Sequence, residues 1–330
     1  MRRVDAAAGG VARKPFRILS LAGGGYLGLY TACVLDALEE RAGVPLARCF
    51  DLLAGTSVGG ILALGLAFEI PARAMRRLFL DHGAEIFSTR PLASRAVSKL
   101  ADLARSVFGP KYDGAALERA LAEQLGNRTI GQALHPVVVP AINISRSMTK
   151  IFKTPHAAKS VGDESIRAVD VAMATCAAPA YFPARKIGRN LFADGGMFAV
   201  APDLVALHEA EQFLDVDLDD VRMLSIGTAT LGYGPAEKIA ADDGAVGWLS
   251  GGRLVMTMIS VQQQHIETIV QDRLRARYMH LDAVWPPKIG LGIDVATPAA
   301  TRALQDLADD TVRHMDARRL RTLFDLPERR

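Results

Sequence analysis

Gly55-Thr56-Ser57-Val58-Gly59 sets a serine between two glycines, and the residues on either side of it decide the fold. The apolar segment 49–54 before it predicts a short buried strand, and the apolar segment 60–68 after it predicts a buried helix. Gly-x-Ser-x-Gly at a strand-to-helix turn is typical of a nucleophile elbow, in which the glycines allow a tight turn and the serine hydroxyl stands at the helix start. The alternative is a glycine-rich turn with an incidental serine.

A second glycine cluster lies upstream, between a predicted strand at 16–21 and a predicted helix that ends near residue 40. Gly23, Gly24 and Gly25 are consecutive, so their backbone amides have no side chain to block an approaching oxygen. Amides of this kind suit an oxyanion hole, which must hold the oxygen of a tetrahedral intermediate.

The same cluster also satisfies Gly-x-Gly-x-x-Gly at Gly23, Gly25 and Gly28, the pattern of dinucleotide-binding folds. That interpretation requires an acidic residue at the end of the second strand to hold the ribose hydroxyls. The second strand passes directly into the serine turn instead, and Asp51 lies inside the strand. We therefore expect no nicotinamide or flavin cofactor.

A nucleophilic serine needs a base, and no histidine of the chain lies in a glycine-flanked loop of the kind that serves a triad. Asp194 is the better candidate, because an apolar strand leads to it and Gly195 and Gly196 then turn the chain away. A carboxylate within about 3 Å can accept the serine proton, provided that burial raises its basicity. The alternative for Asp-Gly-Gly is an ordinary loop turn.

Three motifs in this order, Gly-Gly-Gly-x-x-Gly, Gly-x-Ser-x-Gly and Asp-Gly-Gly, resemble the patatin-like phospholipase family over residues 16–228. The segment 177–183 before the aspartate is also similar to the family's pattern. The resemblance implies a three-layer α/β fold, with a central mostly parallel sheet between helices and a Ser–Asp dyad. It further implies a serine lipid acyl hydrolase that cleaves carboxylic ester bonds of membrane glycerophospholipids and needs no metal or organic cofactor.

Carried over residue by residue, the resemblance makes Ser57 the nucleophile, Asp194 the general base, and the amides of Gly23, Gly24 and Gly25 the oxyanion hole. The remaining motif glycines are Gly28, Gly55, Gly59, Gly195 and Gly196. The chain departs from the family at Ala22 and Leu27, where an aspartate and an arginine are usual. We expect this exchange to change the support of the glycine loop and not to abolish the chemistry.

Composition agrees with a cytoplasmic enzyme that contacts the inner membrane face peripherally. The chain has 330 residues, of which 50% are hydrophobic, and a formal net charge of +3, which is too small to indicate a nucleic acid polymer as partner. Its three cysteines lie in predicted core elements, as in a reducing compartment. No apolar run reaches about 18 residues, and the N-terminus lacks the apolar region of a signal peptide.

We expect a flexible segment at 1–15 and a single domain at 16–330, with a catalytic core at about 16–228 and a helical part at about 245–330. A long helix predicted over 252–276 suits core packing or a homo-oligomer contact. The loosely patterned stretch 89–112 suits either a lid or a lipid-facing segment.

Residues 145–160 contain no acid but several basic side chains, and Arg146, Lys150 and Lys153 are candidates for binding an anion such as a phosphate. The alternative is a solvated basic loop. Two further functions stay open. One is a phospholipase effector of bacterial anti-phage defence that a cyclic nucleotide activates, and the other is a non-catalytic lipid- or nucleotide-binding module.

Overall fold

The computed structural model describes residues 14–87, 109–234, 244, 247–248, 252–286 and 289–326. The predicted flexible segment at 1–15 therefore lies outside the described residues except for its last two. Most of the predicted lid or lipid-facing stretch at 89–112 lies outside them as well.

Within the described residues, eight strands form one sheet in the order β5-β6-β3-β2-β1-β7-β8, with β4 also paired to β3. The strands β3, β2, β1, β7 and β8 run parallel to one another, whereas β4 and β6 pair antiparallel with β3, and β5 pairs antiparallel with β6. Their bounds are β1 Phe16–Leu21, β2 Leu52–Gly55, β3 Val137–Asn143, β4 Met148–Lys153, β5 Arg185–Ile187, β6 Asn190–Asp194, β7 Val221–Ile226 and β8 Tyr278–Leu281.

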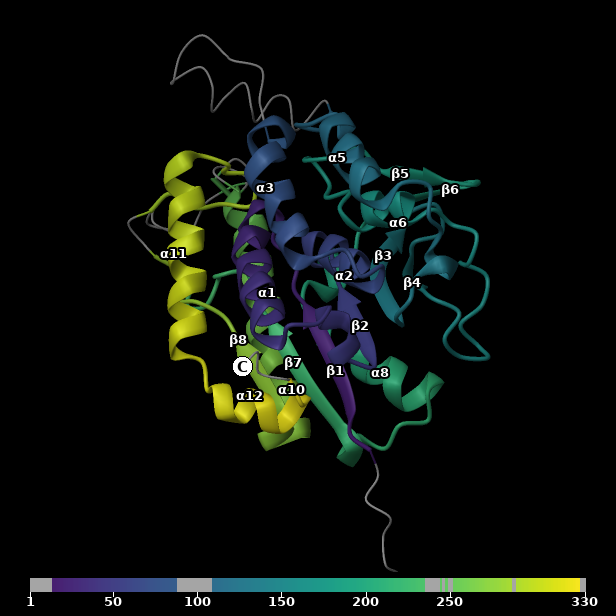
Figure 1. Ribbon diagram of the computed structural model, residues 1–330. Coiled ribbons are helices and arrows are strands. Elements are labelled where there is room, and N and C mark those ends of the chain that lie inside the picture. Colours follow the sequence, from purple (N-terminus) through teal and green to yellow (C-terminus); the bar gives the residue numbers. More distant parts are fainter. Residues whose placement is uncertain are drawn as a thin grey trace, which may run out of the picture.

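Helices cover both faces of the sheet, and Figure 1 shows α1 and α2 on one face with α8 and α10 on the other. This confirms the predicted α/β architecture of a mostly parallel sheet between helices. The helices are α1 Gly28–Ala42, α2 Val58–Ala67, α3 Ala72–Ile86, α5 Ala115–Leu125, α6 Ala168–Thr175, α7 Gly196–Ala199, α8 Asp203–Phe213, α10 Arg253–Leu274, α11 Pro298–His314 and α12 Ala317–Phe324.

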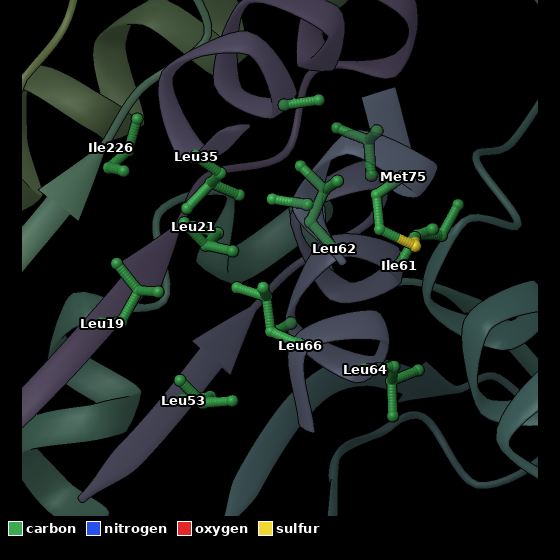
Figure 2. Close-up of a cluster of buried hydrophobic side chains, with 14 of the residues drawn as sticks. Leu19, Leu21, Leu35, Leu53, Ile61, Leu62, Leu64, Leu66, Met75 and Ile226 are labelled. Carbon is green, nitrogen blue, oxygen red and sulfur yellow. The ribbon is translucent and has the colours of Figure 1, made fainter. Parts of the chain in front are cut away.

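Successive side chains of a strand point to opposite faces of the sheet, so the central strands contribute to two separate hydrophobic cores, one on each face. Leu53 of β2 packs into the core beneath α2, whereas Leu52 and Ala54 pack into the core beneath α8. Figure 2 shows Leu53 in one cluster with Leu62 and Leu66 of α2. Because every residue of α2 is buried, the helix that begins at the serine turn has a fixed position.

One edge of β3 serves two strands in succession, and this arrangement joins the two predicted catalytic motifs. β4 occupies one edge of β3 from Val138 to Asn143, so the other edge is left for β2 and β6. β2 pairs with Val137 and Val138, and β6 pairs with residues 141–143. Because β2 is parallel and β6 antiparallel to β3, their C-terminal ends point toward each other.

Most predicted elements are confirmed, with two differences in their bounds. The strand predicted at 49–54 begins only at Leu52, because a short 3₁₀ helix ends at Cys49 and the Asp51 carboxylate is bound to the Arg17 amide at 2.8 Å. The predicted helical part at about 245–330 ends in two helices, α11 and α12, since Asp316 caps a new helix by accepting the Arg319 amide. The predicted long helix at 252–276 is α10.

Candidate active site

Ser57 lies at a strained turn between β2 and α2, as the elbow motif predicts. Its φ is +53°, a left-handed conformation that costs energy for a residue with a side chain and is frequent at functional sites. A Cβ on Gly59 would overlap the carbonyl oxygen of Leu21, and a Cβ on Gly55 would overlap that of Gly59. Both motif glycines are therefore required for the backbone to approach this closely. The Ser57 side chain stays partly exposed.

Asp194 lies opposite Ser57, at the end of β6. The Ser57 hydroxyl donates to Asp194 Oδ2 at 2.7 Å, and the Gly196 amide donates to Oδ1 at 2.7 Å. Asp194 is 6% exposed. Burial raises the pKa of Asp194 to about 6, although these two hydrogen bonds act in the opposite direction. A Cβ on Gly195 would overlap the Pro140 carbonyl, so this glycine allows the turn to pack against β3.

The glycine loop follows β1 and packs beside Ser57. A Cβ on Gly23 would lie 3.1 Å from the Ser57 Cβ, and one on Gly24 would lie 2.7 Å from Thr228 Oγ1. The Gly23 amide already donates to the Val200 carbonyl at 2.8 Å. Among the described residues, none accepts a hydrogen bond from the amide of Gly24 or Gly25, so these two are the donors left for an oxyanion.

The two departures from the family pattern both put a buried apolar side chain in the glycine loop. Ala22 and Leu27 are 2% and 0% exposed, and Leu27 is part of the hydrophobic core. The loop is supported by packing instead. Gly25 has a φ of +59° and lies against Ile293, while Gly28 lies against Val58 at the start of α2.

Two side chains that sequence reasoning missed support the site. The Thr175 hydroxyl accepts the Ser57 amide at 2.9 Å and donates to the Pro140 carbonyl at 2.6 Å, so it links the elbow to β3. The Gln262 side chain of α10 donates to the Gly196 carbonyl at 3.1 Å and accepts the Val200 amide at 3.3 Å. Gln262 therefore connects the turn after Asp194 to Val200, whose carbonyl accepts the Gly23 amide of the glycine loop. Neither residue lies in a motif, so no local pattern marks them.

Other nucleophiles and bases near the site are not prepared for the same chemistry. Burial, together with the nearby Asp194 carboxylate, raises the pKa of the Cys176 thiol well above its usual range, which keeps it protonated. All seven histidines lie within the described residues, and none of them is hydrogen-bonded to Ser57. His156, for example, contacts Glu209 at 3.1 Å.

The three predicted anion-binding residues do not form one open site. Lys150 Nζ lies 2.7 Å from Asp163, and Lys153 Nζ lies 2.6 Å from Glu209. These acids lie outside the acid-free window at 145–160, but the fold brings them back to the two lysines. Arg146 alone stays exposed, on the turn between β3 and β4.

Across the described chain, no helix combines the length and the apolar character needed to cross a membrane. The described residues also hold no cluster of three or more His, Cys, Asp or Glu side chains suited to a metal ion.

Comparisons with known proteins agree with this geometry. The family model described as patatin-like phospholipase matches residues 19–207. A cGAMP-activated phospholipase of Pseudomonas aeruginosa is 41% identical over 88% of this chain and 86% of its own length. One from Escherichia coli is 32% identical over 88% of this chain and 86% of its own. Patatin-like protein 2 of Oryza sativa subsp. indica is 32% identical over 61% of this chain and 54% of its own. The chain belongs to the patatin-like phospholipase family.

Proposed function

We propose that the protein is a phospholipase that hydrolyses carboxylic esters of membrane glycerophospholipids through Ser57 and Asp194. The observation that carries the proposal is the 2.7 Å hydrogen bond from the Ser57 hydroxyl to a buried carboxylate. Membership of the family and the names of the relatives support the same class of reaction.

The geometry supports each step of acyl transfer. Asp194 takes the proton of the Ser57 hydroxyl as the oxygen attacks the ester carbonyl, and it gives that proton to the departing lysolipid alkoxide, which leaves an acyl-enzyme. The amides of Gly24 and Gly25 hold the oxyanion, while the Gly23 amide, engaged with Val200, keeps the loop in place. Asp194 then takes a proton from the water that attacks the acyl-enzyme, and it returns this proton to the Ser57 oxygen as the fatty acid leaves.

The test is lipid mass spectrometry of the purified protein incubated with mixed phospholipid vesicles. We expect fatty acid and lysophospholipid from the wild type, at a rate that rises with pH through about 6 as Asp194 ionises. Ser57→Ala is expected to release neither product while keeping its melting temperature. Unchanged hydrolysis by Ser57→Ala would exclude Ser57 as the nucleophile.

The second candidate function is the same enzyme activated by a cyclic nucleotide, and a role in anti-phage defence depends on that activation. Two relatives are named cGAMP-activated phospholipases, and each aligns with this chain over 86% of its own length, which supports this proposal. A panel of cyclic di- and trinucleotides that includes cGAMP is expected to raise the melting temperature and the hydrolysis rate with one member. If no member shifts either quantity, this proposal fails and the unregulated phospholipase remains.

The third alternative, a non-catalytic binding module, is disfavoured because Ser57 and Asp194 keep a hydrogen bond that a binding module does not need. A fluorophosphonate probe is expected to label Ser57, and absence of labelling in folded protein would revive this alternative. The predicted cytoplasmic location, the peripheral contact with the inner membrane face and the homo-oligomer remain predictions of the sequence.

A further inference from the structure

Two adjacent hairpin turns at one side of the sheet form a single surface. The first turn, at 144–147, joins β3 to β4, and the second, at 188–189, joins β5 to β6. The Ile144 amide donates to the Leu191 carbonyl at 3.0 Å, and the Leu191 amide donates to Ser145 Oγ at 2.9 Å. Figure 1 shows β5 and β6 at the periphery, on the opposite side of the molecule from α11. We name Ile144, Arg146, Met148, Lys186, Arg189 and Leu191 the tip surface.

The apolar members of the tip surface are unusually exposed. Met148 is 60% exposed, Ile144 is 43% exposed and Leu191 is 41% exposed. A single exposed aliphatic side chain on a soluble protein needs no explanation. Three of them at the ends of two hairpins that are bonded to each other are a local concentration, and they provide side chains that can enter an apolar layer.

The charged members of the tip surface are all basic and have no counter-charge. Arg146, Lys186 and Arg189 are exposed, and no ion pair joins any of them to another described residue. The segments 143–149 and 186–191 contain no aspartate or glutamate. The neighbouring cations differ, since Lys150 pairs with Asp163 and Arg185 pairs with Glu118 and Asp170. The tip surface therefore concentrates uncompensated positive charge next to exposed aliphatic groups.

The tip surface lies close to the proposed nucleophile. β6 leads from the tip at Leu191 to Asp194, three residues further along, which is about 10 Å in an extended strand. Met197, 47% exposed, follows the glycine whose amide binds Asp194. Exposed apolar groups are thus present both at the tip and beside the site.

Basic residues on an edge strand also serve to prevent edge-to-edge pairing of sheets, and β5 is such a strand. That purpose accounts for Lys186 but gives no reason for exposed Ile144, Met148 and Leu191. A nucleic acid would match the charge but not the aliphatic side chains. A bilayer with anionic headgroups matches both, because basic side chains bind the headgroups while aliphatic ones enter the acyl boundary.

We propose that the tip surface docks the protein on an anionic phospholipid bilayer, which places the bilayer about 10 Å along β6 from Asp194. The inference rests on the proposed phospholipase function, since it names the surface from which that enzyme would take its substrate. Binding and hydrolysis are separate quantities, so the two proposals can fail independently.

The experiment measures vesicle binding in a Ser57→Ala background, which removes hydrolysis. Sedimentation with phosphatidylglycerol/phosphatidylethanolamine vesicles is compared with sedimentation with phosphatidylcholine vesicles. We expect Ile144→Ser with Leu191→Ser, and separately Arg146→Ala with Arg189→Ala, to lower the partition coefficient on anionic vesicles at least about tenfold. The basic pair is also expected to remove most of the salt dependence of binding. Melting temperatures verify that each variant is folded.

Matched controls come from exposed residues elsewhere in the chain. Leu134 is 66% exposed, and Arg302 is an exposed cation of α11, on the far side of the molecule. Leu134→Ser and Arg302→Ala are expected to bind as the background does. Equal losses in the controls, equal binding to both kinds of vesicle, or tip variants that bind normally would overturn the docking proposal. If tip-dependent binding occurs but the wild type hydrolyses no lipid, only the proposed function fails.

Discussion

Asp194 and Glu209 are two buried carboxylates with hydroxyl neighbours, and they differ in the charges around them. Asp194 accepts from Ser57 at 2.7 Å, and Glu209 accepts from Ser160 at 3.1 Å. They are 6% and 2% exposed, respectively. Their surroundings differ in charge, because Glu209 also contacts Lys153 and His156, whereas no cation pairs with Asp194 among the described residues.

The difference in charge reverses the direction of the pKa shift. Burial raises the pKa of Asp194 to about 6. Burial acts in the same direction on Glu209, but His156 and Lys153 outweigh it and lower the pKa of that carboxyl. A carboxylate stabilised by a cation is a poor proton acceptor. The pair shows that burial makes a base only where the charge is left uncompensated.

The largest expected effect concerns the chemistry of Asp194. Asp194→Asn removes the proton acceptor of Ser57, and we expect the rate of lipid hydrolysis to fall on the order of 1000-fold. Glu209→Gln is the matched control, and its folded fraction is expected to keep the wild-type rate. Steady-state kinetics on both variants test the comparison. Comparable rates for Asp194→Asn and the wild type would refute the role of Asp194.

The next effect concerns the stability that Glu209 supplies. Glu209→Gln leaves the Lys153 ammonium, whose side chain is 14% exposed, without its carboxylate. We expect a loss of about 4 kcal/mol in the free energy of unfolding, measured by urea denaturation, because breaking a buried ion pair strands a charge. Adding Lys153→Met should restore part of the loss. If Glu209→Gln unfolds like the wild type, the ion pair contributes nothing.

Glu209→Gln is expected to destabilise the folded protein, whereas Asp194→Asn is expected to stabilise it. The pKa of Asp194 is higher in the folded protein, about 6, than the ordinary aspartate value of 3.8. Folding therefore favours the protonated form. The contribution of Asp194 to stability is fully present below pH 4 and is lost as the pH rises through about 6.

An asparagine cannot ionise, so Asp194→Asn should be more stable than the wild type above pH 6, by at most about 3 kcal/mol. The gain should disappear near pH 4. Unfolding titrations at several pH values measure it. A variant that is less stable than the wild type at neutral pH would contradict the absence of compensating charge at Asp194.

The smallest effect concerns the support of Ser57. Thr175→Val leaves the Ser57 amide and the Pro140 carbonyl without their shared partner. We expect kcat to fall roughly tenfold, which corresponds to about 1.4 kcal/mol, with KM nearly unchanged. Thr175→Ser keeps the hydroxyl and should restore the rate. Equal rates for the valine and serine variants would show that the hydroxyl does not position the elbow.

The sequence was sufficient to predict the strands β1, β2 and β3 and to single out Ser57 and Asp194 as candidates, because glycines and apolar runs mark these places locally. Segments 16–21 and 137–143 are apolar, and both are strands. β5 has the sequence Arg-Lys-Ile and becomes a strand only by pairing with β6, so no local pattern predicts it.

Thr175 and Gln262, which support the site, could not be predicted either, because no local pattern marks contacts between residues far apart in the sequence. Thr175 and Gln262 reach Ser57 and Gly196 across 118 and 66 residues of chain, respectively. The prediction of an anion site in the basic stretch at 145–160 was wrong for Lys153, because this lysine pairs with Glu209. The two residues are 56 positions apart, so sequence spacing does not reveal the pair. Local patterns mark the reacting groups, whereas the partners that hold or neutralise them depend on tertiary structure.

The shared edge of β3 makes the contact between Ser57 and Asp194 a matter of strand register. Ala54 of β2 lies beside Val138 and Asp194 lies beside Ala141, so three residues of β3 set the gap. If β6 slipped by one residue, Asp194 would point to the opposite face, and a two-residue slip would move it by about 7 Å. A perturbation that loosens only the β5–β6 hairpin would therefore inactivate the enzyme while the rest of the molecule stays folded.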